Sequence, residues 1–376
     1  MRKISNRLPL FLFVSMLLTG CGTVLSRASD PYASADGQSG VERKRPSKIY
    51  SGATLDVKSF TPENSIIVLV DFPFSVAADT LLLPLTIYEQ FIAENELQAA
   101  AAKGDISTVN NLLEHGANIN AKDAYGYTAL MTAAWAGRSE AMKFLLDKGA
   151  TVNEQNRYSG ATALMYSVNV ADNVQLLLNS GANVQQKNKY GRTALMIAAD
   201  MSNAATVKLL LDHGADVNAK DEDGRTALAV VILNKKWQQK RDMGIAQLLL
   251  DKGSDIKVQD NDGFTLFDYA LGVYDKGVKP SLGGDADAIS LLLNNGANPN
   301  SVGHCYRTPM MVAAEVSNQA AARLLLEKKA EVNFKVQKSN IWWCSPFLKG
   351  KTALMLATER GNTGMVELLK NAGAVE

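Results

Sequence analysis

The sequence predicts a mainly α-helical repeat solenoid from residue 94 onward, preceded by a small N-terminal module with a strand and a helix. Two markers that recur in phase indicate the repeats. The first is Thr-Ala-Leu-Met or a degenerate form of it, beginning at Thr128, Thr162, Thr193, Thr226, Thr265, Thr308 and Thr352. The second is Leu-Leu-x-x-Gly-Ala or a close variant, with its glycine at Gly116, Gly149, Gly181, Gly214, Gly253, Gly296 and Gly373. Because one such repeat cannot bury its own apolar face, the repeats must stack on one another.

The spacing of the markers indicates the type of repeat. Successive threonines lie 34, 31, 33, 39, 43 and 44 residues apart. This period and the Thr-x-Leu opening resemble ankyrin repeats, whose Pro and His positions are held here mostly by Ala and Met. The resemblance implies two helices and a β-finger in each repeat. The segment from Glu94 to Asp123 lacks the opening Thr and looks like an N-terminal capping repeat, so we expect about eight repeats over residues 94–376.

Each position of the repeat has a physical role. The Thr begins the first helix and caps it through its hydroxyl. Small pairs such as Ala133-Ala134 let neighbouring repeats approach closely, and leucines such as Leu145-Leu146 fill the buried face of the second helix. The glycine that follows suits a left-handed C-cap. We expect Asn153, Asn218 and residues 221–224 to start and turn the β-fingers.

The later repeats depart from the base period. Extra residues fall around 235–241, in the Gly/Pro-containing segment 272–284, and between Asn333 and Thr352, where the last finger is lengthened. Lys329 replaces the usual glycine, which makes the seventh repeat the least regular.

Residues 1–20 have the features of a secretory signal peptide. Arg2, Lys3 and Arg7 form a positive start, and residues 8–18 are largely apolar. Leu18-Thr19-Gly20-Cys21 resembles the lipobox of bacterial lipoproteins, in which the cysteine carries fatty acyl chains such as palmitate and becomes the new N-terminus. The alternative is a plain signal peptide or a membrane anchor with a chance cysteine.

The lipobox resemblance implies that Cys21 is lipidated and anchors the protein in the cell envelope without a transmembrane helix. Gly22, where sorting to the inner membrane would call for Asp, favours an outer-membrane lipoprotein that faces the periplasm. The polar, small residues up to 48 form a flexible tether from Cys21, because few of them could join a core.

A separate module is expected over residues 49–92. Residues 65–70 form a β-branched run of strand length. It is followed by the motif Asp71-x-Pro73-Phe74-Ser75-x-x-x-Asp79-Thr80-Leu81-Leu82-Leu83-Pro84. With this motif the region resembles the YceK/YidQ lipoprotein family. The resemblance implies no molecular role for the module. We interpret Asp71 and Asp79 as turn and helix-cap residues.

Two cysteines remain beside Cys21. Export leads to an oxidising compartment, where Cys305 and Cys344 are a natural pair. Cys305 precedes Thr308, and Cys344 lies in the long finger before Thr352, so a disulfide would join adjacent fingers. Two free thiols or a disulfide to a partner protein are the alternatives.

Composition and motifs argue against catalysis and nucleic-acid binding. The formal net charge is +1, without the basic excess of a nucleic-acid binder. No phosphate-binding loop, nucleophile motif or zinc-protease motif is present, so we expect no enzyme activity and no cofactor. His304 and Cys305 form the only metal-like pair, without further ligands in a suitable spacing, so no metal is expected. His115 and His213 occupy a position that ankyrin repeats often fill with His.

The solenoid therefore offers surface in place of chemistry. The resemblance implies a concave face made of first helices and fingertips. The aromatic and arginine side chains expected on it are Trp135, Arg138, Tyr125, Tyr127, Tyr158, Tyr190, Arg192, Arg225, Phe264, Trp342 and Trp343. These residue types carry most of the binding energy in protein interfaces.

Three functions remain open on the sequence. The first is a membrane-anchored periplasmic adaptor or scaffold, expected to be monomeric, that holds an envelope protein. The second is an immunity or inhibitor protein that blocks a periplasmic toxin or enzyme. The third is an envelope enzyme or wall-binding lipoprotein with its site in residues 50–90.

Overall fold

The computed structural model describes residues 95–233, 243–273, 284–337 and 348–375. By its internal contacts the chain divides into two units, Met1–Leu83 and Pro84–Glu376, and all described residues belong to the second. The signal peptide, the tether and the 49–92 module fall outside the described residues. No helix among the residues described here has the length and apolar character needed to cross a membrane.

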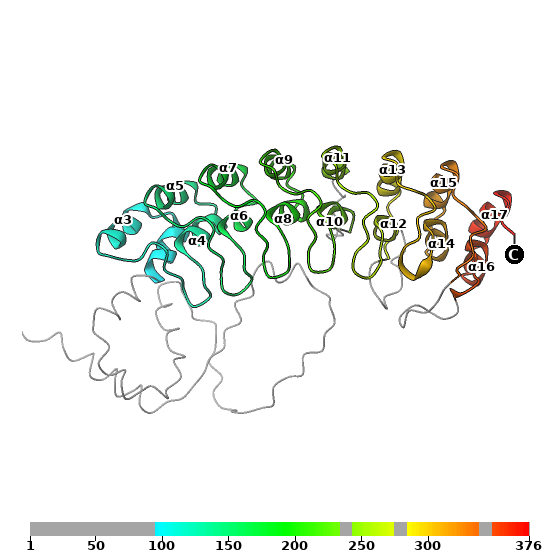
Figure 1. The fold of residues 1–376 in the computed structure, drawn as a ribbon, viewed down its shortest axis with the longest axis horizontal. Coiled ribbons are helices and arrows are strands. Elements are labelled where there is room, and N and C mark those ends of the chain that lie inside the picture. Colours follow the sequence, from blue (N-terminus) through cyan, green and yellow to red (C-terminus); the bar gives the residue numbers. More distant parts are fainter. Residues whose placement is uncertain (1–94, 234–242, 274–283, 338–347, 376) are drawn as a thin grey trace, which may run out of the picture. The chain divides into compact units, whose positions relative to one another are not determined.

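The second unit is a stack of helix pairs, as the sequence predicts (Figure 1). After the helical residues 95–103, the second helices of the successive pairs are α3 (Ile106–Glu114), α5 (Ser139–Asp147), α7 (Ala171–Asn179), α9 (Ala204–Asp212), α11 (Met243–Asp251), α13 (Ala286–Asn294), α15 (Gln319–Glu327) and α17 (Thr363–Asn371). The first helices are α4 (Ala129–Trp135), α6 (Ala163–Tyr166), α8 (Ala194–Asp200), α10 (Ala227–Leu233), α12 (Leu266–Ala270), α14 (Pro309–Glu315) and α16 (Ala353–Glu359). A short 3-10 helix, η5 (His304–Tyr306), lies before α14.

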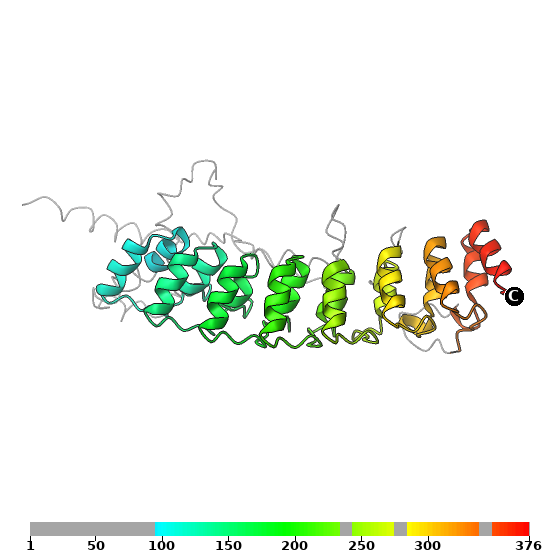
Figure 2. The same cartoon turned by 90° about the horizontal axis from the view of Figure 1, so that it is seen from above.

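The two sets of helices form two rows. In Figure 1 the second helices follow one edge and the first helices lie between them and the finger loops. Figure 2 shows the second helices standing side by side. We number the repeats from the capping repeat, which ends with α3, so that repeat 2 holds α4 and α5 and repeat 8 holds α16 and α17.

The opening threonine caps every first helix, as expected. In each of the seven repeats the hydroxyl of the buried Thr accepts a hydrogen bond from the backbone N–H three residues on, at 3.3–3.4 Å. The small positions and Leu145 are buried as predicted, whereas Leu146 is half-buried. Ala133 and Ala134 are buried between repeats, and Leu145, Leu177 and Leu210 of the second row are fully buried.

The fingers are tight loops without a strand in the described part of the chain; a single antiparallel bridge joins Gln259 and Thr265. An Asp or Asn starts most fingers. In repeat 4, the side chain of Asn188 accepts hydrogen bonds from the N–H groups of Tyr190 and Arg192, both at 2.9 Å, while its own N–H donates to the Arg192 carbonyl. The aspartates at 123, 221 and 260 do the same in repeats 2, 5 and 6.

An amide ladder ties successive repeats together along the loops that follow the second helices. The Asn153 side chain accepts from the Asn183 N–H at 2.7 Å and donates to the Gly181 carbonyl at 3.0 Å. Asn218 makes the equivalent pair of bonds to Asp255 and Gly253. We expected Asn153 and Asn218 to start and turn the fingers. Their side chains instead join one repeat to the next.

The irregular repeats keep the stacking. Lys329 takes the left-handed backbone conformation of the glycine it replaces, with φ of 62°. Cys305 is buried within η5. Cys344, Trp342 and Trp343 lie outside the described residues, so the Cys305–Cys344 pairing stays a prediction.

Candidate protein-binding surface

Three tyrosines occupy the same position at the fingertips of repeats 2, 3 and 4. Tyr125, Tyr158 and Tyr190 are 48%, 58% and 37% exposed, which makes them three of the most exposed large apolar side chains in the described chain. The tips of repeats 2 and 4 are held by the finger hydrogen bonds described above, and in repeat 3 the Asn156 side chain accepts hydrogen bonds from the N–H groups of Ser159 and Ala161. The Tyr side chains are therefore presented from ordered loops.

Backbone contacts join one tip to the next. The Lys189 N–H donates to the Ser159 carbonyl at 2.8 Å, and the Glu222 N–H donates to the Tyr190 carbonyl at 3.0 Å. The tips touch so closely that a Cβ at Gly126 would lie 2.3 Å from the Arg157 nitrogen. Gly126 also has φ of 83°, so this position excludes other residues on both grounds. The row of tips is a continuous edge.

Trp135 extends this edge toward the first helices. It ends α4 and is 57% exposed. Arg138 follows it and is also exposed, although its Nε donates to the Ala102 carbonyl at 3.0 Å and so attaches it to the capping repeat. Tyr127 is half-buried: its ring centroid lies 5.5 Å from that of Tyr166, whose hydroxyl donates to the Tyr127 hydroxyl. Trp135, Tyr125, Tyr158 and Tyr190 are the accessible aromatic residues of this region.

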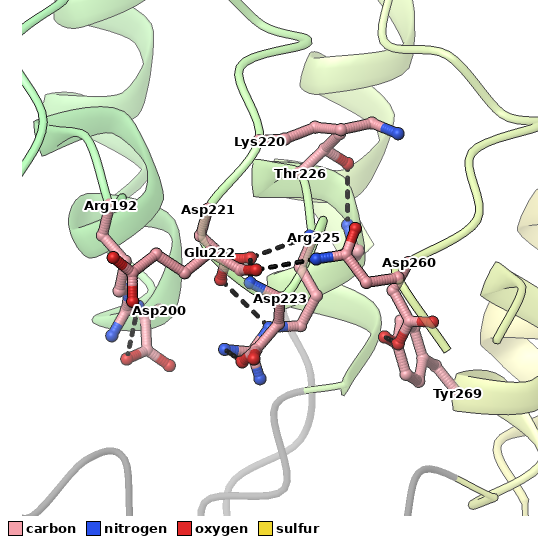
Figure 3. Close-up of polar contacts among 12 residues, drawn as sticks. Arg192, Asp200, Lys220, Asp221, Glu222, Asp223, Arg225, Thr226, Asp260 and Tyr269 are labelled. Carbon is pink, nitrogen blue, oxygen red and sulfur yellow. Dashed lines mark hydrogen bonds and ion pairs between the residues drawn. The ribbon is translucent and has the colours of Figure 1, made fainter. Parts of the chain in front are cut away.

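Two residues expected on the surface are buried, and these expectations are corrected. Phe264 is 2% exposed because the His304 ring of the next repeat stacks on it, with centroids 3.9 Å apart. Arg192 is 8% exposed, and its guanidinium donates to Asp200 at 3.1 Å (Figure 3). Arg225 is half-buried and engaged by Asp221 at 3.0 Å and Asp223 at 2.5 Å. None of the three offers a partner an unengaged side chain.

The Arg192–Asp200 pair belongs to a pattern that sequence reasoning missed. The residue before the capping Thr forms an ion pair with the residue eight positions on, at the end of the first helix. Arg307 pairs with Glu315 in repeat 7, and Lys351 pairs with Glu359 in repeat 8. Arg360 of repeat 8 reaches back to Glu315 at 2.9 Å. The signal in the sequence was a basic residue before the capping Thr with an acidic residue eight positions later, repeated in these three repeats.

The same two positions are apolar or neutral in repeats 2 and 3. Tyr127 and Trp135 fill them in repeat 2, and Ala161 and Asn169 fill them in repeat 3. The inner face of repeats 4, 7 and 8 is thus occupied by internal ion pairs, whereas that of repeats 2 and 3 is not. This difference places the accessible aromatic surface at the N-terminal end of the described stack.

The buried carboxyls near repeats 5 and 6 are engaged in structural hydrogen bonds. Burial raises the pKa of Asp260, which accepts a short hydrogen bond from the Tyr269 hydroxyl (Figure 3). Burial and the neighbouring Asp260 raise the pKa of Tyr269. Burial also raises the pKa of Asp268, whose carboxylate accepts from the N–H and hydroxyl of Thr265, both at 2.8 Å. Each carboxyl already has its partner inside the fold.

The histidines also have local partners. His115 and His213 place Nδ1 against the carbonyl four residues before, at 2.7 and 2.9 Å, at the ends of α3 and α9. His304 Nδ1 lies 2.8 Å from the Asp262 carbonyl. Across the described ranges, no group of three His, Cys, Asp or Glu side chains could hold a metal ion.

Comparison with known proteins agrees with the geometry. Residues 87–156, 164–262 and 280–375 match the family described as ankyrin repeats, three copies. Curated relatives include the ankyrin repeat, SAM and basic leucine zipper domain-containing protein 1 of Mus musculus, 44% identical over 54 residues, which are 14% of this chain and 11% of that protein. Ankyrin repeat domain-containing protein 29 of Danio rerio is 42% identical over 57 residues, 15% of this chain and 19% of its own length.

A third relative carries an enzyme's name. The probable E3 ubiquitin-protein ligase XBOS33 of Oryza sativa subsp. japonica is 40% identical over 73 residues, 19% of this chain and 14% of that protein. This chain therefore spans less than a fifth of the length of each of these relatives. The family match covers most of the chain, and we conclude that the chain belongs to the ankyrin-repeat family.

Proposed function

We propose that this protein is a membrane-anchored interaction module of the periplasm, in which lipid on Cys21 fixes the chain to the outer membrane and the repeats hold an envelope protein. The coarser part follows from the family, because ankyrin repeats are protein–protein interaction modules. The anchor rests on the lipobox resemblance at residues 18–21. The repeats supply binding and no chemistry of their own.

The accessible aromatic surface of repeats 2–4 carries this proposal. Trp135, Tyr125, Tyr158 and Tyr190 are between 37% and 58% exposed on adjoining tips and on the end of α4. Trp and Tyr are the residue types most enriched among binding hot spots. Because backbone bonds already order the tips, a partner would bind them with little loss of conformational entropy.

The binding role is tested by capture from the native envelope. The full chain with Trp135→Ala and Tyr158→Ala should retain the partner at least about tenfold less well than the unaltered chain, because each truncated hot spot costs 2 kcal/mol or more. Val375→Ala is the matched control, since it truncates another exposed apolar side chain at the far end of the described stack. Equal retention by the double variant and the control would refute the assigned surface.

The anchor is tested separately. The unaltered chain should incorporate radiolabelled palmitate and Cys21→Ser should not, because no acyl chain can then be attached. Equal labelling of the two chains, or of neither, would contradict lipid anchoring at Cys21.

The identity of the captured protein distinguishes the adaptor from an inhibitor. A toxic enzyme that loses activity in the complex would assign the repeats to an immunity role. Binding or activity retained by a chain that carries residues 50–90 with altered repeats would move the function to the N-terminal module.

A further inference from the structure

The charge of the fingertip row changes sign between repeats 4 and 5. The residue before the tip tyrosine is Arg157 in repeat 3 and Lys189 in repeat 4. In repeat 5 the same two tip positions hold Glu222 and Asp223. The row therefore passes from cations beside tyrosines to carboxylates within one repeat.

The cations are accessible. Arg157 and Lys189 are both exposed. The Lys189 ammonium donates one hydrogen bond to the Arg157 carbonyl at 2.7 Å, which fixes its place and leaves two protons for a ligand. Two carboxylates of repeats 3 and 4 are already engaged: Glu154 pairs with Lys122, and Asp200 pairs with Arg192.

The carboxylates of repeat 5 are accessible as well. Glu222 is exposed, and its backbone holds the tip: its N–H donates to Tyr190, and its carbonyl accepts from Asn261 Nδ2 at 2.7 Å. Its carboxylate has no partner among the described residues. Asp223 is paired with Arg225 on one side, and its side chain remains 67% exposed.

The step from tip to tip matches an extended polypeptide. Neighbouring stacked helices lie about 8–10 Å apart, so equivalent tips are separated by about the same distance. An extended or polyproline segment advances about 3.1–3.4 Å per residue, so every third residue of it would meet one tip. The exposed faces of Tyr158 and Tyr190 give such a segment an apolar floor.

We propose, on the basis of the proposed function, that the tip row of repeats 3–5 binds an extended partner segment of polarised charge. Its acidic half lies on Arg157 and Lys189, and its basic half lies on Glu222 and Asp223. Tyr158 and Tyr190 contact the segment between these charges. The match of charges selects the partner and fixes its register along the stack.

The test uses two fluorescein-labelled peptides of the same composition and net charge, with a charge at every third position and prolines between. In one, two glutamates precede two lysines; in the other, glutamate and lysine alternate. The full chain, in nonionic detergent, should bind the segregated peptide at least about tenfold more tightly by fluorescence anisotropy at low salt. This preference should shrink as salt rises, because exposed charges are screened.

Charge reversal supplies the variant. Arg157→Glu with Lys189→Glu should reduce binding of the segregated peptide at least about tenfold. The control is Lys143→Glu with Lys370→Glu, which makes the same change of charge at exposed positions on α5 and α17 and should leave binding unchanged. Unaltered thermal melting of both variants shows that the stack remains folded.

Three results would overturn the inference. Equal binding of the two peptides, or binding of neither, would show that the row does not select polarised charge. Equal losses in both variants would show that only net charge matters. A dimer in sedimentation that Arg157→Glu with Lys189→Glu dissociates would assign the row to a second copy of the chain. Because capture through Trp135 and Tyr158 is measured independently, the proposed function can stand while this inference fails.

Discussion

Gly303 shows how closely successive repeats fit at the scale of one residue. A Cβ there would lie 2.4 Å from Asp268 Oδ2 and 3.0 Å from the Thr265 methyl group. Its backbone is extended, so the requirement for glycine is one of space and not of φ. The Asp268 oxygen cannot move away at low cost, because it is fully buried and accepts two hydrogen bonds from Thr265.

Gly303→Ala should therefore lower the free energy of unfolding by about 1–3 kcal/mol, the usual cost of overpacking a fitted core. Gly364→Ala is the matched control, since its new Cβ would meet only the flexible end of Gln319. Alanine there should be neutral or stabilise α17 by about 0.5–1 kcal/mol. Chemical denaturation of both variants checks this, and equal stability of the two would contradict the steric explanation.

Asp105 makes the capping repeat sensitive to acid. Hydrogen bonds from the Ser107 and Thr108 side chains, and from the Thr108 N–H, lower the pKa of this N-cap carboxyl to about 2 from an ordinary value of 3.8. Because the folded pKa lies below the unfolded one, the stabilisation is complete above pH 4 or so and is lost as the pH falls toward about 2.

Hydrogen exchange of α3 should therefore accelerate between about pH 4 and pH 2 in the unaltered chain. Asp105→Asn keeps a good capping side chain without the titrating group, so its exchange should depend on pH only through the chemistry of exchange itself. An identical extra acceleration in the Asn variant would show that another group controls the acid response of α3.

Residue types and their spacing were enough to predict the local structure. The threonine caps, the alanine contacts and the leucine face depend on neighbours within one repeat or at a fixed offset, so the pattern of the sequence contains them. Exposure was harder to predict. Phe264 and Tyr190 occupy nearby finger positions, yet His304 of the next repeat covers the first, and nothing within repeat 6 announces that contact.

At the scale of elements, the amide ladder ties successive repeats together outside the core. Its rungs start from residues 120, 153, 185, 218, 300 and 333 and reach the loop of the following repeat. Between repeats 5 and 6 the corresponding residue is Lys257, and no such rung forms there among the described residues. Sequence reasoning missed the ladder because each bond joins residues 30 to 42 positions apart, where no local rule applies.

Lys257→Asn should add the missing rung, with the Asn298 N–H and the Gly296 carbonyl as partners. We expect a gain in the free energy of unfolding of about 0.5–1.5 kcal/mol for each bond that forms. Asn218→Ala, which removes the existing rung to Asp255 and Gly253, should cost a similar amount. Denaturant unfolding measures both, and a Lys257→Asn chain no more stable than the unaltered one would contradict the ladder's contribution.

At the scale of the whole stack, the two ends of the described repeats differ in which side chains are paired and which are exposed. Repeats 7 and 8 are joined by the Arg307–Glu315–Arg360 network, so their inner-face charges satisfy one another. Repeats 2–4 carry the exposed aromatic side chains. The resemblance to ankyrin repeats predicts a binding face in general, but it spreads the expected contact residues from Tyr125 to Trp343. Only the packing of the folded chain shows which of these side chains are bonded to other residues and which are accessible to a partner.

The central claim is that a protein partner lies on the tips of repeats 2–4 in the native envelope. The most direct measurement places a photo-crosslinking residue, in separate full-length chains, at Trp135, Tyr125, Tyr158 and Tyr190, and at Lys143 on the outer helix α5 as a control. We predict one dominant adduct, shared by the four surface positions and absent at Lys143. No adduct at any of the four, or an equal yield at Lys143, would contradict the claim.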